Sequence, residues 1–357
     1  VMPSIVRSAG HVRTFSALAA LLAISVLLNG LIVQPFAWIA ARGLAGFALA
    51  GSYMVIESWL NERVTNETRG KVFSLYMVIS MAAMMGGQFA MPLARPELAT
   101  GFMICAILYA MAVIPNALSR AASPKPLTQV RLDLGAIYRN SPAAVVGVFL
   151  SGILSGGWTN MAPVFGQKIG LSTAEISVLL VSTMAGGAVL QVPLGRISDK
   201  IDRRAVMILA GLIGLAAAFV ALTFWSGGAF TLFAIAFTIG GVIYPAYSLA
   251  VAHANDYAEP ADFVKISGGL LILYGFGTMG GPLLAAWLME RYGPEGIFLA
   301  TGGAHALLAA YAAYRMLRRQ AVPAAEREDF QAVPLARTQT PASFPLDPRA
   351  EPRPADD

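Results

Sequence analysis

The chain has 357 residues, of which 57% are hydrophobic and only 13% are charged, about half the charged share of a typical soluble domain. This composition excludes an ordinary soluble protein and indicates a polytopic membrane protein. The sequence pI is about 9.4, but the lysines and arginines are dispersed among apolar runs. A membrane protein with basic loops on one side therefore explains the excess better than nucleic-acid binding does.

The sequence argues against several kinds of chemistry. The single cysteine, Cys105, lies inside an apolar run, which excludes an intrachain disulfide and a cysteine-based metal site. The three histidines are far apart in the sequence, whereas a metal site needs converging ligands. No Gly-x-x-x-x-Gly-Lys phosphate-binding loop and no close pair of catalytic-type residues occurs within the apolar runs. We therefore expect no metal, no cofactor, no catalytic residues and no enzymatic activity.

Ten apolar runs are long enough to cross a hydrocarbon core of about 30 Å. Helices are the expected spanning element, because each satisfies its own backbone hydrogen bonds in lipid. The sequence thus predicts an all-α integral membrane protein. In chain order, the runs are Thr14–Ile32, Phe36–Ile56, Val72–Leu93, Gly101–Leu118, Ala143–Phe165, Ala174–Leu194, Ala205–Trp225, Phe230–Ala252, Ile266–Met289 and Gly296–Leu317.

The charges of the connecting loops predict the orientation. Lysine and arginine gather in alternate loops and both terminal segments, while the opposite loops contain only Arg95, Lys168 and Arg291. Because basic loops remain in the cytoplasm, both termini are expected there.

An internal repeat appears when the sequence is shifted by 194 residues, which places Gly46 on Gly240, Tyr53 on Tyr247 and Lys71 on Lys265. Chance similarity among glycine-rich helices is the alternative. Parallel repeats are typical of transporters built from two halves. The counterparts of 143–165 and 174–194 would precede Val1, so we expect a chain that lacks its first two helices of twelve; a genuine ten-helix protein is the alternative.

The stretch Gln191 to Arg204, QVPLGRISDKIDRR, joins two apolar runs through a tight basic turn. We expect the first helix to end at Pro193 and Gly195. The spacing of Gly195, Asp199, Arg203 and Arg204 resembles the cytoplasmic loop signature of the major facilitator superfamily, and similar spacing around Gly10 and Arg13 suggests a degenerate first-half copy. Asp202 stands where that family usually has glycine.

A second stretch, Glu57-Ser-Trp-Leu-Asn61 followed by a loop rich in Asn, Thr and Arg, resembles the YcaD-like inner-membrane branch of this family. The resemblance implies a bundle of two pseudo-repeated halves. It also implies a monomeric secondary active transporter in the bacterial inner membrane that moves a small solute by alternating access, with efflux as one direction and H⁺ or Na⁺ as a coupling ion. The alternatives are a non-transporting scaffold or sensor of the same fold and an inactive truncated fragment.

Polar and charged residues within the apolar runs are candidates for the solute path, because they are costly in lipid unless they face the bundle interior. Arg42, whose spacing to Gly46 resembles a family arginine motif, could instead extend to the membrane interface. Glu57 could be a coupling group or the partner of Arg63 or Arg69. The path candidates are Arg42, Tyr53, Glu57, Gln88, Trp158, Asn160, Gln191, Tyr244, Tyr247 and Tyr274, and the gate candidates are Gly195, Asp199, Arg203 and Arg204.

The expected organisation has four parts. Residues 1–118 form the first half, 119–141 a cytoplasmic linker with prolines and basic residues, and 142–318 the second half. Residues 319–357 are rich in proline and mixed charge, so we expect a disordered cytoplasmic tail.

Overall fold

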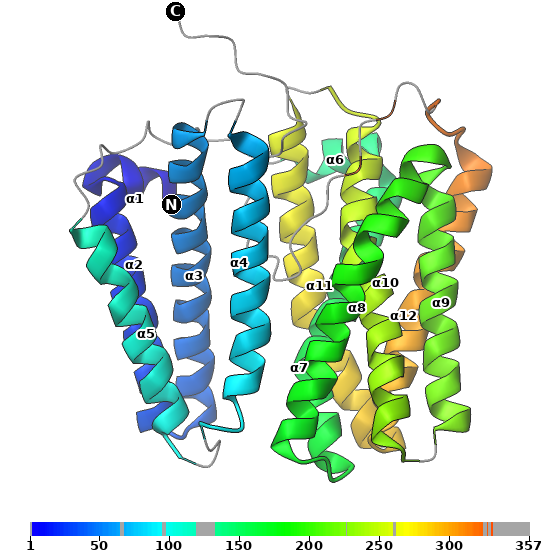
Figure 1. Cartoon of the computed structure of the whole chain (residues 1–357). Coiled ribbons are helices and arrows are strands. Elements are labelled where there is room, and N and C mark those ends of the chain that lie inside the picture. Colours follow the sequence, from blue (N-terminus) through cyan, green and yellow to red (C-terminus); the bar gives the residue numbers. More distant parts are fainter. Residues whose placement is uncertain are drawn as a thin grey trace, which may run out of the picture. The chain divides into compact units, whose positions relative to one another are not determined.

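The computed structural model describes residues 2–64, 68–94, 98–118, 133–225, 227–259, 262–323, 327 and 330, and all of the regular structure among them is helical (Figure 1). The helices are α1 (Met2–Ala9), α2 (His11–Leu31), α3 (Pro35–Arg63), α4 (Arg69–Ala90), α5 (Thr100–Ala117), α6 (Leu134–Asn140), α7 (Pro142–Lys168), α8 (Thr173–Lys200), α9 (Arg203–Phe224), α10 (Ala229–Asn255), α11 (Phe263–Tyr292) and α12 (Gly296–Arg318).

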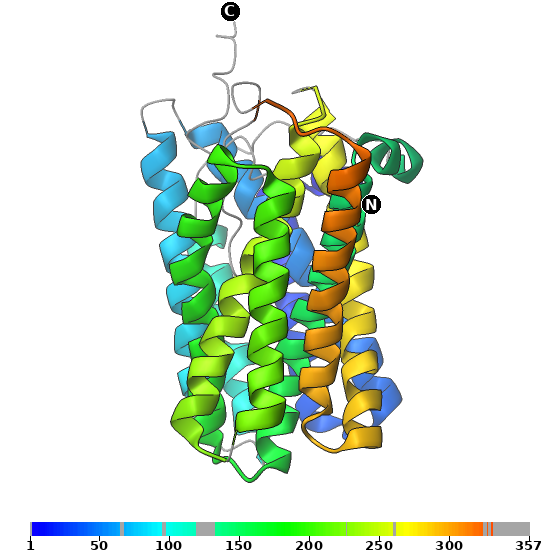
Figure 2. The ribbon, with the colours of Figure 1, turned by 90° about the vertical axis from the view of Figure 1, so that its right-hand side faces the viewer.

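The helices belong to two compact units, α1–α5 within Val1–Val130 and α6–α12 within Arg131–Leu335. Within the second unit, the long helices run roughly parallel or antiparallel to one another (Figure 2). Residues 119–132 of the predicted linker lie outside the described residues. The remainder of the linker is described and contains α6. Most of the predicted tail also lies outside them.

The ten predicted runs correspond one to one with the ten long helices of the described chain. Nine of these helices are long and apolar enough to cross a membrane, and α4 contributes a shorter apolar stretch, Val78–Ala90. The prediction of an all-α membrane protein is therefore confirmed. The short helices α1 and α6 were not predicted, because neither contains a membrane-length apolar run.

The predicted end of the sixth run at Pro193 and Gly195 is wrong, since α8 continues through both residues to Lys200. Membrane helices tolerate proline when neighbouring groups satisfy the freed backbone carbonyl. The connection to α9 therefore contains only Ile201 and Asp202.

The structure confirms the internal repeat. A shift of 194 residues carries the first residue of α3 onto the first residue of α10, and the first residue of α4 onto that of α11. The packing repeats as well, because α2 lies against α3 and α5 just as α9 lies against α10 and α12. The two units are thus pseudo-repeats of each other over these helices.

Glycines set the closest helix contacts of the second unit, where α8 packs along α10 and α7 along α11. An added Cβ at Gly240 would overlap the carbonyl oxygen of Thr183, and one at Gly281 would overlap that of Ile153. Small residues let membrane helices approach this closely. The repeat mates of these glycines, Gly46 on α3 and Gly87 on α4, have open space in the same position.

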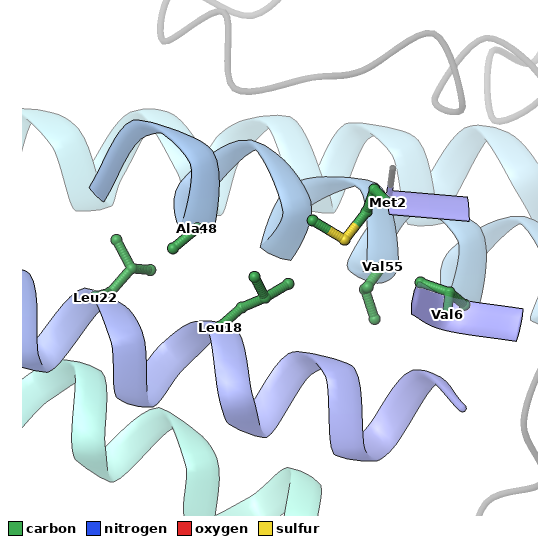
Figure 3. Close-up of a cluster of buried hydrophobic side chains, with 6 residues drawn as sticks. All are labelled: Met2, Val6, Leu18, Leu22, Ala48 and Val55. Carbon is green, nitrogen blue, oxygen red and sulfur yellow. The ribbon is translucent and has the colours of Figure 1, made fainter. Parts of the chain in front are cut away.

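The first unit is held by an apolar cluster in which α1 contributes Met2 and Val6 (Figure 3). These side chains meet Leu18 of α2 and Val55 of α3, both buried. The turn from α1 into α2 is made by Gly10 at φ 80°, a conformation that favours glycine. The stretch that resembled a degenerate loop signature therefore forms a helix and a glycine turn.

We expect Gly281→Ala to destabilise the protein by about 1–3 kcal/mol, because the new methyl group meets rigid backbone. The adjacent Gly280→Ala is the matched control, since an added Cβ there meets nothing within 4 Å. Thermal unfolding of the two variants in detergent would reveal the difference. Equal midpoints would contradict the proposed role of backbone contact between α7 and α11.

Candidate functional site

The turn between α8 and α9 is built by Asp202, which caps the N-terminus of α9 by accepting a hydrogen bond from the backbone N–H of Arg204 at 2.9 Å. Asp202 has φ −56°, which any residue adopts, so glycine is not needed here. Burial raises the pKa of Asp202, but hydrogen bonds and charge from Arg204 outweigh burial and hold the pKa below its usual value. The departure from the family pattern thus supplies a helix cap.

Arg203 is the centre of the site, and its side chain is fully buried. Its guanidinium binds both carboxylate oxygens of Asp256, with Nε to Oδ2 at 2.7 Å and Nη2 to Oδ1 at 3.1 Å. It also donates to Asp199 Oδ1 at 3.2 Å and to Ser198 Oγ at 3.1 Å. Because Asp256 directly follows α10, this one side chain joins the ends of α8, α9 and α10.

Arg204 extends the network to α12. Its guanidinium pairs with the Asp202 carboxylate at 2.7 Å. It also donates to the backbone carbonyls of Arg315 at 2.9 Å and Arg319 at 2.8 Å. An arginine bonded to the last carbonyls of a helix stabilises that terminus.

A third set of contacts connects helix termini at the same end of the second unit. Arg319 donates to the carbonyl of Asn140 at 2.8 Å and lies 3.7 Å from the ring centroid of Tyr257. The Asn140 amide in turn donates to the carbonyl of Ala254 at 3.0 Å. The ends of α8, α9, α10 and α12 and the junction of α6 with α7 are therefore connected, and we call this set of contacts the signature network.

Three of the four predicted gate residues, Asp199, Arg203 and Arg204, lie in this network, and Gly195 lies one turn before Asp199 on α8. Sequence reasoning missed Asp256, the strongest partner of Arg203. A signal was present, because the repeat that aligns Asn61 with Asn255 also aligns the acidic residues Glu62 and Asp256.

A second cluster of candidates lies between the helices of the same unit. Gln191 of α8 is buried, and its amide donates to Ser248 Oγ of α10 at 3.4 Å. Tyr247 of α10 and Tyr274 of α11 meet edge to face with ring centroids 5.1 Å apart, and Tyr244 is also buried. We call these five residues the polar cluster. Four of the predicted path residues thus lie on α8, α10 and α11, and α10 packs against both of the others.

The two remaining path candidates of the second unit lie elsewhere. Trp158 is buried, donates to Thr183 Oγ1 at 3.0 Å and packs against Phe298 with ring centroids 5.8 Å apart. Asn160 is exposed and donates to the carbonyl of Gly156 on its own helix at 2.8 Å. Both stay predictions as path residues.

The first unit contains the other path candidates. Glu57 is fully buried and accepts a hydrogen bond from the Tyr76 hydroxyl of α4 at 3.2 Å. Arg42 is exposed on α3, while Tyr53 and Gln88 are half-buried. The side chains of Arg63 and Arg69, the alternative partners of Glu57, lie outside the described set. Within the described residues, no group of His, Cys, Asp and Glu could hold a metal ion.

This architecture, a pseudo-repeated bundle of apolar helices with a buried arginine network at one end, is that of a multi-pass membrane protein. Residues 144–348 match the family profile of the Major Facilitator Superfamily, and the chain belongs to that family.

Curated relatives agree with this assignment. The MFS-type transporter YcaD of Salmonella heidelberg is 25% identical over 76% of this chain and 70% of its own length. YcaD of Escherichia fergusonii is 24% identical over 83% of this chain and 76% of its own length.

Among solved structures, the E. coli fucose:proton symporter FucP is similar in fold, with a TM-score of 0.52, 13% identity and coverage of 88% of this chain and 86% of its own. At that identity the likeness shows the fold alone.

We expect Arg203→Ala to destabilise the protein by about 3–5 kcal/mol, because Asp256 is left as a buried charge without its partner. Arg196→Ala is the control, since Arg196 is an exposed arginine near the end of α8 that contacts the network. Thermal unfolding in detergent measures both variants. If both unfolded at the same temperature as the parent protein, the central place of Arg203 in the network would be wrong.

Proposed function

We propose that this protein is a secondary active transporter that moves a small solute across the bacterial inner membrane by alternating access, with residues 1–118 and 142–318 as its two halves. Membership of a transporter family supports the proposal. The observation that carries it is the polar cluster, because buried amide and hydroxyl groups are costly between apolar helices unless they make hydrogen bonds. Such groups can exchange their internal partners for those of a solute.

The chemistry of the polar cluster favours a solute with hydrogen-bonding groups and an apolar face. Gln191 and Ser248 offer an amide and a hydroxyl, and the rings of Tyr247 and Tyr274 offer flat apolar surface beside their hydroxyls. Arg42 and Glu57 of the first unit are proposed path residues as well. Glu57 is the candidate for proton coupling, because a buried carboxylate held by a tyrosine hydroxyl can exchange a proton.

The signature network is proposed to form the cytoplasmic gate of the second half. Its connected helix ends would move as one body while the two halves rock about the solute site. Gly195, Asp199, Arg203 and Arg204 are its proposed gate residues, and we propose Asp256, the partner of Arg203, as a fifth.

A solute screen by thermal shift tests the proposed site. We expect a transported solute at about 100 times its Kd to stabilise the parent protein by about 2.7 kcal/mol. Tyr247→Ala should lose this response, whereas the control Tyr311→Ala, on α12, should keep it. Uptake or efflux of the same solute in proteoliposomes then separates transport from binding. A solute that binds at the polar cluster without flux would support the scaffold or sensor alternative.

The orientation is tested by cysteine labelling in a Cys105→Ser background, which removes the single native thiol. Arg196→Cys, beside the signature network, should react with a membrane-impermeant maleimide only after the cells are permeabilised. Phe230→Cys, at the start of α10 where the side chain is 85% exposed, should react in intact cells. The opposite pattern would place the signature network outside the cytoplasm and overturn the proposed orientation.

A further inference from the structure

Two described residues beyond α12, Arg327 and Phe330, lie against the signature end of α8. Phe330 is only 5% exposed, and its ring lies directly on Gly195, where an added Cβ would overlap the ring. Gly195 is buried in this arrangement. The missing side chain of this glycine therefore provides the space that an aromatic ring fills.

The backbone of Phe330 makes a second contact with α8. Its N–H donates to Asp199 Oδ1 at 2.8 Å. Asp199 lies one turn after Gly195, so both groups are on one face of the helix. The same oxygen atom accepts the hydrogen bond from Arg203. Phe330 is thus held by a ring contact and by a charge-assisted hydrogen bond.

Arg327 provides a third, independent contact. Its guanidinium donates to the carbonyl of Ile201 at 2.6 Å, just after the last residue of α8. It also donates to the carbonyl of Val322 at 2.7 Å. A cation at the C-terminus of a helix is favoured by the helix dipole. The carbonyl, the carboxylate and the glycine surface lie in order along the end of α8.

We propose that Gly195, Asp199 and Ile201 form a peptide docking site at the signature end of the second unit, and that its occupant is the segment of this chain that carries Arg327 and Phe330. The site recognises an aromatic side chain, the N–H of the same residue and an arginine three positions earlier. Docking does not depend on transport. Its consequence does rest on the proposed function: because the segment binds a gate carboxylate, docking stabilises the present arrangement of the signature network.

Limited proteolysis of the full chain by trypsin tests the docking at the bond after Arg327. A synthetic peptide of residues 321–335 contains only this trypsin site and gives the intrinsic cleavage rate. We expect the full chain in detergent to be cleaved at this bond at least about tenfold more slowly than the peptide, a difference equivalent to about 1.4 kcal/mol. Intact-mass measurement over time gives both rates.

Two variants identify the contacts. We expect Phe330→Ala to accelerate cleavage by about tenfold, measured against a peptide that carries the same change. Gly195→Ala leaves the segment itself unchanged and should also accelerate cleavage by about tenfold. Gly303→Ala, at a glycine with open space around an added Cβ, and Phe230→Ala, at an exposed phenylalanine, should not. The comparison of the parent chain with its peptide tests the docking even if a variant does not fold.

Equal cleavage of the parent chain and the peptide would overturn the docking site, and an unchanged rate in Gly195→Ala would remove Gly195 from it. These outcomes leave the proposed transport untouched, because no solute is involved. Conversely, if no transported solute were found, slow cleavage after Arg327 would still support docking, and only the proposed transport would fail.

Discussion

The buried guanidinium of Arg203 is the constraint on which the second unit depends. A charge without solvent must find partners for its N–H groups, and Asp256, Asp199 and Ser198 supply them. These partners come from the end of α8 and from the residue after α10, so the charge is satisfied only when both helix ends are in place. Arg204 adds α12 by the same principle. Ion pairs and hydrogen bonds thus determine which helix ends meet at this end of the unit.

The end and the interior of the helix bundle are stabilised by different interactions. Charged groups are concentrated at the signature end, where the cost of burying them is offset by close ion pairs, whereas the interior between helices is held by backbone contacts at Gly240 and Gly281. This division follows from the cost of charge in lipid and the ease with which small residues let helices approach. The polar cluster around Gln191 and Tyr247 is an exception to this pattern, which is the physical reason for proposing the solute site there.

Much of the fold could be predicted, because length and hydropathy alone identify a membrane helix. Helix ends were less predictable: Pro193 and Gly195 would end a helix in water, but α8 passes through both. The proposed gate residues Gly195, Asp199, Arg203 and Arg204 could be nominated because they lie close together in one motif of the sequence. Asp256 was missed because it meets Arg203 from 53 residues away. Short helices such as α6 carry no apolar run, so only the packed structure reveals them.

The position of Phe330 links the docking site to the signature network through a single atom. Asp199 Oδ1 accepts from both Arg203 and the Phe330 N–H, so a rotation of this carboxylate would weaken two hydrogen bonds at once. Charged acceptors shared in this way make neighbouring contacts depend on one another. A docked segment therefore favours the orientation of Asp199 that Arg203 also requires, and loss of either contact lowers the cost of losing the other. The coupling needs no change elsewhere in the helices, because both donors act on the same side chain.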